Sequence, residues 1–332
     1  MKKTFLIVFM VLFSVSSMVV YCQKTPQGRL SDEALLTLVQ KQTFRYFWDF
    51  GHPQSGLARE RSNSPSGGDV VTTGGSGFGI MALIDGIERG FITREEGVER
   101  MQKILAILDR KADAFHGIWP HWMDGATGKT IRFSRKDDGA DLVESAFMFE
   151  GLLAAHQYFS NNSPKESSIR GIISRLWRQA EWDWFTKGGE EVLYWHWSPN
   201  NGWAMNHQIR GHNECHIVYI LAASSPTYPV KESVYHKGWV QSRVFRNNRE
   251  YYGINLPLGT DFGGPLFFTH YSYMGLDPRG LKDNYADYRE QMVNHTLINR
   301  QHCIVNPNNY KGYGPNCRSE EHTSELQSRQ SI

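Results

Sequence analysis

Amphipathic helical segments recur along most of the chain, and this pattern constrains the fold more than any other feature. Long loops rich in glycine and aromatic residues separate the segments, which recur at roughly 40 to 60 residues per pair without self-similarity. Helix pairs joined in this way predict an all-α fold, an (α/α) toroid whose inner helices point their N-termini at a central cleft. An irregular helical bundle would show the same periodicity. The expected segments are residues 31–47, 72–89, 93–113, 138–159, 164–185, 211–224 and 283–299.

Two stretches of alternating aromatic residues interrupt the helical pattern. Residues 117–133 contain a turn sequence at 124–128, and residues 190–205 contain one at 199–202. Alternation around a turn rich in Gly, Asn and Asp is typical of a β-hairpin. We therefore expect two hairpins on the rim of the cleft.

The N-terminal residues have the layout of a secretory signal peptide. Lys2 and Lys3 precede an apolar run over residues 5–21, which is short for a membrane span and is followed at once by polar sequence. Cys22 stands where a lipoprotein signal peptide would be cut, so it is a candidate lipidation site. We expect a signal peptide over 1–22, a tether over 23–30, and export to the periplasm or to the outer membrane as a lipoprotein. A retained membrane anchor is the alternative.

The C-terminal residues do not read as part of the same protein. From Arg318 the chain reads Arg-Ser-Glu-Glu-His-Thr-Ser-Glu-Leu-Gln-Ser, a string that a common sequencing-library adapter encodes in one reading frame. We interpret residues 318–332 as an artefactual tail, against the alternative of an ordinary polar tail. Residues 31–317 would then form one incomplete, C-terminally truncated domain. Such a domain would expose the apolar flanks of its first and last helices.

Composition excludes several classes of function. The net charge of +2 gives no electrostatic case for nucleic-acid binding. Cys215, Cys303 and Cys317, the cysteines after the signal peptide, match no disulfide or metal-binding spacing. Aromatic residues make up 13% of the chain, including ten Trp, which is more than a core requires and suits surfaces that stack on sugar rings.

An acidic cluster, Asp137, Asp141 and Glu144, has the spacing i, i+4 and i+7. On a helix these carboxylates share one face near its N-terminal end, where repulsion and exclusion of water raise the pKa of at least one. Such a group can hold sugar hydroxyls or position a proton donor. The alternative is capping, with Asp138 as N-cap and Asp141 in the first turn, which leaves Glu144 unexplained.

Glu214 leads directly into the apolar run of residues 217–221, at the mouth of an expected buried helix. Apolar surroundings raise the pKa of a carboxyl group, as a general acid near neutral pH requires. A favourable interaction with the helix dipole would explain Glu214 equally well. His212 and His216 flank it, but His-x-Glu-x-His lacks the i, i+4 spacing of a helical zinc motif, so we expect no metal site.

Aromatic, histidine and arginine residues are the candidates for substrate binding. In a hairpin Trp195 and Trp197 would share one face, where they would either stack on sugar rings or fill the core. The histidines and arginines could bond hydroxyl groups, or be structural and surface residues. The candidates are Arg59, Trp119, His121, Trp122, Arg132, Trp195, His196, Trp197, Asn213, His270 and Tyr271.

Several blocks together resemble the glycoamylase-like family, which includes endo-β-1,2-glucanases and sophorose-releasing relatives. The resemblance implies an (α/α)6 toroid of the six-hairpin glycosidase type with a deep glucan cleft. It implies an inverting hydrolase with Glu214 as general acid, beside a cleft lined by Asp137, Asp141 and Glu144. It places the base in the C-terminal third, beyond the end of this chain. The blocks are residues 75–82 (GSGFGIMA), 139–144 (GADLVE), 211–214 (GHNE), 267–272 (FFTHYS) and 274–278 (MGLDP), within a resemblance over residues 30–316.

The expected activity is endo-hydrolysis of β-1,2-glucan by a monomer that needs no cofactor. The nearest alternative is an exo-enzyme that releases sophorose from β-1,2-glucooligosaccharides. A polysaccharide lyase would use Tyr or His to abstract a proton from a uronic acid, but the arginine content near the expected cleft is modest. A non-catalytic glycan-binding lipoprotein would not require so many close carboxylates.

Overall fold

The computed structural model describes residues 30–63, 68–243 and 245–316. The predicted signal peptide with Cys22, nearly all of the tether, and the tail over 318–332 lie outside the described residues. The chain divides into two compact units, residues 1–39 and 40–332. Of the first unit the structure describes the beginning of helix α1 (Asp32–Trp48), where the apolar side chains of Leu35, Leu36, Leu38 and Val39 are exposed.

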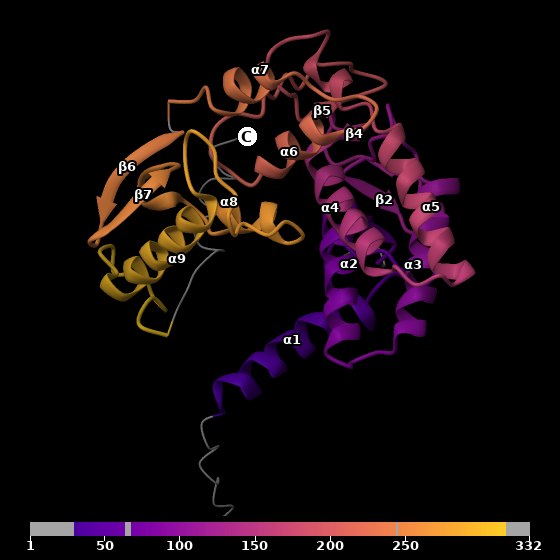
Figure 1. Ribbon diagram of the computed structural model, residues 1–332, viewed down its shortest axis with the longest axis horizontal. Coiled ribbons are helices and arrows are strands. Elements are labelled where there is room, and N and C mark those ends of the chain that lie inside the picture. The colour runs from indigo at the N-terminus through magenta and orange to yellow at the C-terminus, as the bar shows by residue number, and fades with distance from the viewer. Residues whose placement is uncertain (1–29, 64–67, 244, 317–332) are drawn as a thin grey trace, which may run out of the picture. The chain divides into compact units, whose positions relative to one another are not determined.

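The described residues are mostly helical, with small antiparallel sheets (Figure 1). After α1 the helices are α2 (Thr73–Glu88), α3 (Arg94–Arg110), α4 (Leu142–Tyr158), α5 (Pro164–Gln179), α6 (His216–Ser224), α7 (Glu232–Val234), α8 (Phe267–His270) and α9 (Tyr288–Val305). Short turns of 3-10 helix lie at Trp182–Thr186, Asp261–Gly263 and Tyr271–Tyr273, and a turn of π-helix lies at Tyr235–Trp239.

Within the described ranges the strands form three small antiparallel sheets. One has the order β1-β2-β3, a second pairs β4 with β5, and a third is a hairpin of β6 and β7. The strands are β1 (Val70–Thr72), β2 (Trp122–Asp124), β3 (Thr130–Ile131), β4 (Ala140–Asp141), β5 (His196–Trp197), β6 (Arg246–Tyr251) and β7 (Ile254–Leu258).

Glycine allows α2 and α4 to pack closely against each other. A Cβ atom on Gly77 would lie 2.1 Å from the carbonyl oxygen of Phe147, and one on Gly151 would lie 2.5 Å from the carbonyl oxygen of Gly77. Both distances are too short for any other residue, so Gly77, in the sequence block at 75–82, and Gly151 make this contact possible. The close approach brings the N-terminal turn of α2 next to the N-terminal turn of α4.

Local capping signals explain where several helices begin. The capping box of Thr93 and Glu96 is present at the start of α3, as the sequence predicted. Helix α4 begins at Leu142 with Asp141 as its N-cap, not near Asp138. The helical spacing that the sequence suggested for Asp137 is therefore wrong, because Asp137 precedes the helix.

One predicted hairpin is confirmed, and the other is present but irregular. Strands β2 and β3 pair as expected within residues 117–133, and β1 adds to them. Around the predicted turn at 199–202, Ser198 forms an antiparallel bridge with Gly202. The strand β5 before this turn also pairs with β4: Asp141 lies opposite His196, and Ala140 lies opposite Trp197. The long-range pairing brings the segment around His196 to the start of α4, which the local turn sequence could not show.

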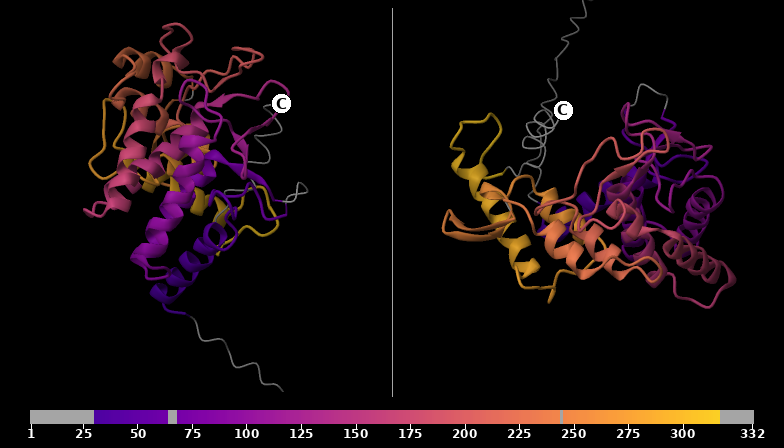
Figure 2. Two further views of the ribbon diagram at one scale, coloured as in Figure 1. Left: turned by 90° about the vertical axis from the view of Figure 1, so that its right-hand side faces the viewer. Right: turned by 90° about the horizontal axis from the view of Figure 1, so that it is seen from above.

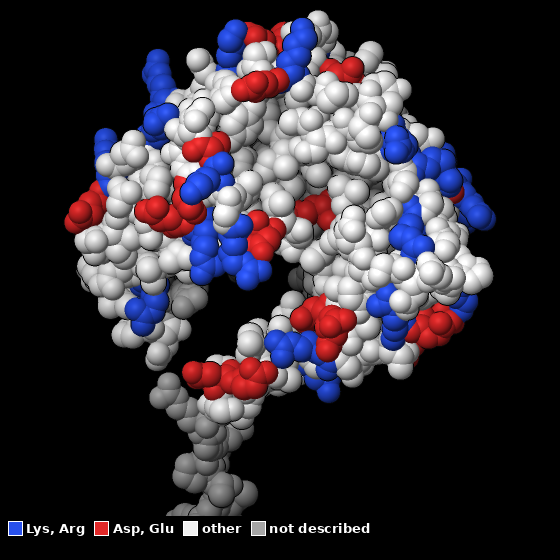
Figure 3. Space-filling view, in the orientation of Figure 1, with Lys and Arg blue, Asp and Glu red and all other residues white. Residues whose placement is uncertain are grey.

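The β6–β7 hairpin was not predicted from the sequence. It packs along α9, as two views show (Figures 1 and 2). The side-chain amide of Gln291 on α9 bonds both the amide and the carbonyl of Leu258 on β7. No helix of the described residues is long and apolar enough to span a membrane. On the face drawn in Figure 3, basic and acidic side chains alternate, in keeping with the small net charge.

Candidate active site

Asp141 lies at the N-terminal end of α4, at the centre of the acidic cluster. Its Oδ1 accepts hydrogen bonds from the amides of Val143 and Glu144, at 3.0 and 2.9 Å. Its Oδ2 lies 2.9 Å from Nδ1 of His121. The side chain is buried, with 1% of its surface exposed. Asp141 is thus held by three donors, and it both caps α4 and pairs with His121.

His121 supplies positive charge to the cluster. Burial lowers its pKa, but the hydrogen bond to Asp141 and the charges of Asp141, Glu144 and Asp137 outweigh burial and raise the pKa to about 9. His121 is therefore an imidazolium at neutral pH. One face of its ring lies near Phe133, with the ring centroids 4.1 Å apart. The side chain is still 21% exposed, so a ligand can reach it.

Asp137 and Asp138 have different roles although they are adjacent. Asp137 Oδ1 lies 3.0 Å from Nε2 of the buried His196. Asp138 accepts hydrogen bonds from Ser198 and from Asn200. Burial acts to raise the pKa of Asp138, but these bonds lower it below its usual value. Asp138 therefore holds the turn after β5, while Asp137 belongs to the same cluster as His121 and Asp141.

His121, Asp137 and Asp141 offer possible metal-ligand atoms within 4.8 Å of one another. Over the described part of the chain they are the one such group, and the His212, Glu214 and His216 pattern forms none. A protonated histidine has no lone pair for a metal, so the ion pair between His121 and Asp141 competes with a cation there.

Glu144 projects from the first turn of α4 onto the N-terminal turn of α2. Its Oε2 accepts a hydrogen bond of 2.8 Å from the amide of Gly74. A Cβ atom at position 74 would lie 2.4 Å from the same oxygen, so only glycine allows this approach. Burial, and then the charge of Asp141, raise the pKa of Glu144, although the charge of His121 opposes them. This environment favours a proton on Glu144 more than the surface would.

Glu214 precedes α6 and has a different environment. Its Oε2 is buried and has no hydrogen-bond partner among the described residues. Burial, and then the charge of Glu144, raise the pKa of Glu214 to about 7. This is the direction that the sequence predicted. Glu214 therefore carries a proton for much of the time near neutral pH, as a general acid must.

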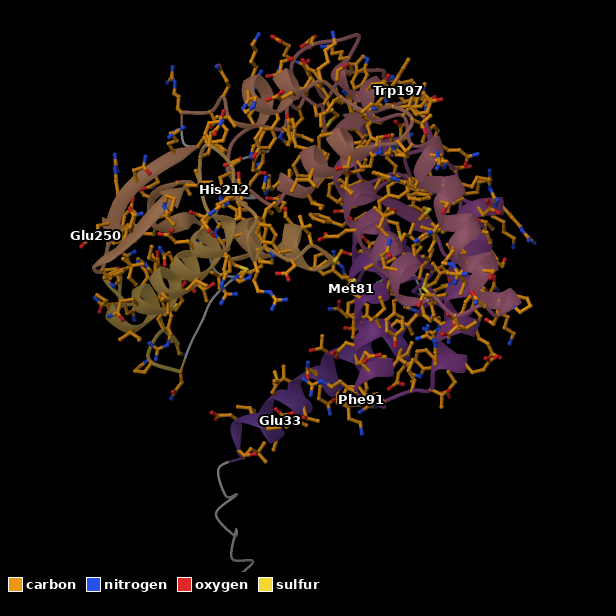
Figure 4. All side chains as sticks on the ribbon, viewed as in Figure 1. Glu33, Met81, Phe91, Trp197, His212 and Glu250 are labelled. Carbon is orange, nitrogen blue, oxygen red and sulfur yellow. The ribbon has the colours of Figure 1, made fainter. Side chains whose placement is uncertain are left out.

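The histidines beside Glu214 belong to the core. His216 stacks between Trp239 and Tyr288, with ring centroids at 5.4 and 4.2 Å, and its ring nitrogens lie 3.1 and 3.2 Å from the hydroxyls of Tyr273 and Tyr235. Burial lowers the pKa of His216 to about 4, so it is neutral. Figure 4 shows His212, which is also buried, on the interior side of the chain. The His216 side chain is therefore structural, and His212 is buried with no hydrogen-bond partner for its Nδ1 among the described residues.

A cavity of about 340 Å3 connects the acidic cluster with two of the predicted binding residues. Glu144 lies in its wall together with Arg59 and Tyr271. The ring of Phe78 lies edge-on to Tyr271 at 4.7 Å and forms a further part of the wall. The cavity therefore combines aromatic surface, a carboxyl group and a guanidinium, the set of groups that binds a sugar ring.

Burial removes two candidates from direct contact with a substrate. Trp119 is 1% exposed and packs on Phe149. His196 is buried against Asp137. The sequence suggested binding for both because residue type does not reveal burial. Asn213 is partly exposed, and its side chain accepts a bond of 3.0 Å from the amide of Cys215, so it orders the turn that carries Glu214.

The remaining candidates are spread over different surroundings. Trp122 is partly buried against Phe133, and Arg132 is exposed. Trp195 stacks on His207, whereas Trp197 meets His116 edge-on, so the two tryptophans do not form one continuous platform. Trp197, labelled in Figure 4, is the second residue of β5 and lies opposite Ala140 of β4. His270 bonds the hydroxyl of Thr296 on α9.

A larger hollow of about 1400 Å3 lies elsewhere, between residues 181–192 and 228–237. Trp184 and Trp203 line it, and its Lys237 forms an ion pair with its Glu191. None of the predicted site residues lines this hollow. The chemistry of the candidate active site therefore lies in the smaller cavity and around Glu214, not in this larger hollow.

Sequence reasoning did not single out two residues that contact this site. Ser272 bonds the backbone carbonyl of Glu214, and Gly74 bonds Glu144. Ser272 stands in the block at 267–272 and Gly74 directly precedes the block at 75–82, but only spatial contact shows their roles. Glu150, a buried carboxyl on α4 whose pKa burial raises to about 8, was also not singled out.

The chain is similar in sequence and structure to proteins of the glycoamylase family. Residues 206–318 match the model of the glycoamylase family, described as putative glucoamylase. The structure resembles a putative glucoamylase from Bacteroides uniformis with a TM-score of 0.85 and 72% sequence identity, over 88% of this chain and 71% of that one. It resembles an endo-beta-1,2-glucanase from Chitinophaga pinensis, in complex with sophorotriose and glucose, with a TM-score of 0.83 and 53% identity, over 86% of this chain and 70% of that one.

A curated protein is similar as well. The chain is 47% identical over 307 residues to the exo beta-1,2-glucooligosaccharide sophorohydrolase (non-reducing end) of Parabacteroides distasonis. The match takes in 87% of this chain and 42% of that protein. The chain therefore spans less than half the length of this curated relative.

Proposed function

Because this chain belongs to the glycoamylase family, we propose that it is a glycoside hydrolase that cleaves β-1,2-glucan with Glu214 as the general acid. The observation that carries the proposal is the buried Oε2 of Glu214, which has no hydrogen-bond partner among the described residues, together with its raised pKa. Two of the similar proteins are named for action on β-1,2-linked glucose, which supports the linkage.

In the proposed reaction Glu214 gives its proton to the glycosidic oxygen while the bond from that oxygen to C1 breaks. Water attacks C1 from the opposite face, and a carboxylate base takes the proton of that water. An inverting enzyme needs the base roughly 6.5 to 9.5 Å from the acid, so that water fits between them. We assign no base among the described residues.

The acidic cluster and His121 would hold the sugar next to Glu214. Glu144, in the wall of the cavity, presents an acceptor for hydroxyl hydrogens, and the partly exposed imidazolium of His121 presents a donor, while the buried Asp141 orients His121. Glu144 would thus serve binding, and Glu214, whose pKa is raised to about 7, would serve proton transfer. The aromatic wall at Tyr271 suits the apolar face of a glucose unit.

Exo action is the form of the activity that the curated relative favours. That relative is named as a sophorohydrolase acting at the non-reducing end, whereas a structure of similar identity is named as an endo-enzyme. The name of the curated relative thus supports exo action, the alternative to the endo-hydrolysis expected from the sequence. A time course of products separates them, because endo cutting gives a ladder of lengths and exo cutting gives sophorose from the start.

The proposal also includes the arrangement and location of the protein. An (α/α)6 toroid would gather the N-termini of α2, α4 and α6 around the glucan, and the short β-sheets would form the rim. The run over residues 5–21 supports export, with attachment at Cys22 as a lipoprotein. Replacing Cys22 by Ala should release the exported protein from the membrane fraction. Membrane attachment that survives this change would argue for a retained anchor.

The test of the function compares Glu214→Gln with the unaltered protein, both expressed from the complete gene. We expect kcat on linear β-1,2-glucan to fall by about 10³-fold, because the variant cannot donate a proton, while glucan binding is kept. Glu190→Gln is the matched control. It changes an exposed carboxyl group that lines the larger hollow of about 1400 Å3, so it should keep full activity.

Starch and β-1,3-glucan serve as substrate controls, and unsaturated products that absorb in the ultraviolet would instead indicate a lyase. Cleavage of starch alone would overturn the proposed linkage but not the role of Glu214. Undiminished turnover by Glu214→Gln would overturn the role of Glu214 as the acid.

A further inference from the structure

A serine distant in sequence holds the backbone of Glu214. The hydroxyl of Ser272 donates a hydrogen bond of 2.7 Å to the carbonyl oxygen of Glu214. The same hydroxyl accepts a bond of 3.0 Å from the amide of Ile217, in the first turn of α6. Ser272 is 1% exposed. Solvent does not reach this hydroxyl, so its two bonds tie the backbone of Glu214, two residues before α6, to the first turn of the helix.

Helix α6 needs this contact because it has no side-chain cap of its own. The first amides of a helix lack partners within the helix, and Cys215 at the N-cap position makes no side-chain cap. Helices α3, α4, α5 and α9 are each capped by the residue directly before them, namely Thr93, Asp141, Ser163 and Asp287. At α6 the capping oxygen comes from another segment of the chain.

The segment that carries Ser272 is itself fixed at several points. The hydroxyl of Tyr273 lies 3.1 Å from Nδ1 of His216, on α6. The amide of Gly275 donates a bond of 2.9 Å to the buried carboxyl of Glu150, on α4. Tyr271 lies in the wall of the cavity that contains Glu144. The segment therefore ties the start of α6 to α4 and to the cavity.

We propose that Ser272 is a positioning residue for Glu214, whose hydroxyl fixes the backbone from which the acid reaches the glycosidic oxygen. The inference rests on the proposed function, because it requires Glu214 to be the acid. A single peptide unit separates the bonded carbonyl from the start of α6, so a shift of this unit moves the Glu214 carboxyl directly. A displacement of about 1 Å at a reacting group can cost a hundredfold in rate.

Ser272→Ala tests the proposal in protein expressed from the complete gene. We expect kcat on β-1,2-glucan to fall by about ten- to a hundredfold and KM to stay within about twofold, because binding residues are unchanged. The alkaline limb of the pH profile should move to lower pH. A looser first turn admits water to Glu214, so its pKa falls toward its usual value and the proton is lost earlier. Ser272→Thr keeps the hydroxyl and should restore most of the rate.

Ser225→Ala is the matched control for simple loss of stability. Ser225 follows the last residue of α6, is also buried, and accepts a bond of 3.1 Å from the amide of Tyr228. It should lower Tm comparably while kcat and the pH profile stay unchanged. If Ser272→Ala behaves like Ser225→Ala, or if Ser272→Thr fails to recover activity in a folded protein, the positioning role is wrong.

The Glu214→Gln variant separates this inference from the proposed function. An inactive Glu214→Gln with a normal Ser272→Ala overturns the positioning role alone. An active Glu214→Gln overturns both, because Ser272 would then position a residue that has no part in proton transfer. Loss of rate in both variants, with the shifted alkaline limb in Ser272→Ala only, supports both.

Discussion

The N-terminal ends of α4 and α6 both lie at the candidate active site, but the carboxyl groups there have opposite surroundings. At α4, Asp141 caps its own helix and is paired with the protonated His121. At α6 the helix is capped from Ser272, and the carboxyl of Glu214 is buried with no partner for its Oε2 among the described residues. One end surrounds its carboxylate with hydrogen-bond donors, and the other buries a carboxyl oxygen without one. Position at a helix N-terminus therefore does not decide the environment of a carboxyl group; burial and the neighbouring donors do.

Removing Asp141 should produce the largest loss of stability in this comparison. Asp141→Ala leaves two amides of α4 unpaired and leaves His121 without its partner, so we expect a loss of about 3 to 5 kcal/mol in the free energy of unfolding. Glu214→Gln should leave the stability unchanged or slightly increased, because it removes a desolvated acid. Urea denaturation of both variants measures the difference, and equal losses would contradict it.

Three buried histidines should make the protein less stable at low pH, whereas His121 should make it less stable at high pH. Burial lowers the folded-state pKa of His212 to about 3 and that of His216 and His295 to about 4. The unfolded chain takes up these protons first, so stability falls as pH drops from about 6.5 toward 4. At about 1.4 kcal/mol per pKa unit, His216 alone accounts for about 3 kcal/mol of this loss.

His121 should act in the other direction. Its folded-state pKa of about 9 lies above the unfolded value. Its contribution of about 3 kcal/mol is complete below pH 6.5 and is lost as pH rises through 9. Urea denaturation at a series of pH values, with His121→Gln as the second sample, checks both limbs. The variant should lose the alkaline decline and keep the acid one; an unchanged alkaline limb would show that His121 is not its source.

A substitution at Gly74 of α2 tests the single contact that this residue makes with Glu144. In Gly74→Ala the added methyl group would meet the Glu144 carboxyl, so we expect about a tenfold fall in kcat and a loss of about 1 to 2 kcal/mol. Gly171→Ala on α5 is the control, because a Cβ there meets nothing within 4 Å, and it should gain about 0.5 to 1 kcal/mol. Full activity in Gly74→Ala would mean that Glu144 does not need its present position.

Elements whose signals are local were predicted from the sequence. The capping box at Thr93, the helical periodicity and the turn at residues 124–128 all act over a few residues, and the structure has the helix α3 and the β2–β3 hairpin where they indicate. The pairing of β4 with β5 was not predicted, because it joins residues that lie more than fifty positions apart. The same holds for the β6–β7 hairpin against α9, in which Gln291 satisfies the backbone of Leu258.

Some features of the candidate site were likewise predicted from local sequence, and others were visible only in the structure. The sequence singled out Glu214 from its apolar neighbours, and Asp141 and Glu144 from their spacing at the start of a helix. It treated Trp119, His196 and Asn213 as binding residues, although the first two are buried and the third bonds the backbone. Residue type indicates what a side chain can bond, but burial and partners come from segments that fold onto it from elsewhere.

By itself the sequence determined the residue types and the short-range geometry: which segments become helices and which residues are available to cap them. Only the tertiary structure decided the surroundings of the carboxyl groups. His121 bonds Asp141, and burial and the charge of Glu144 raise the pKa of Glu214. Desolvation and Coulomb interactions depend on distance in space, and folding places residues from α2, α4, α6 and the segment of Ser272 within reach of one another.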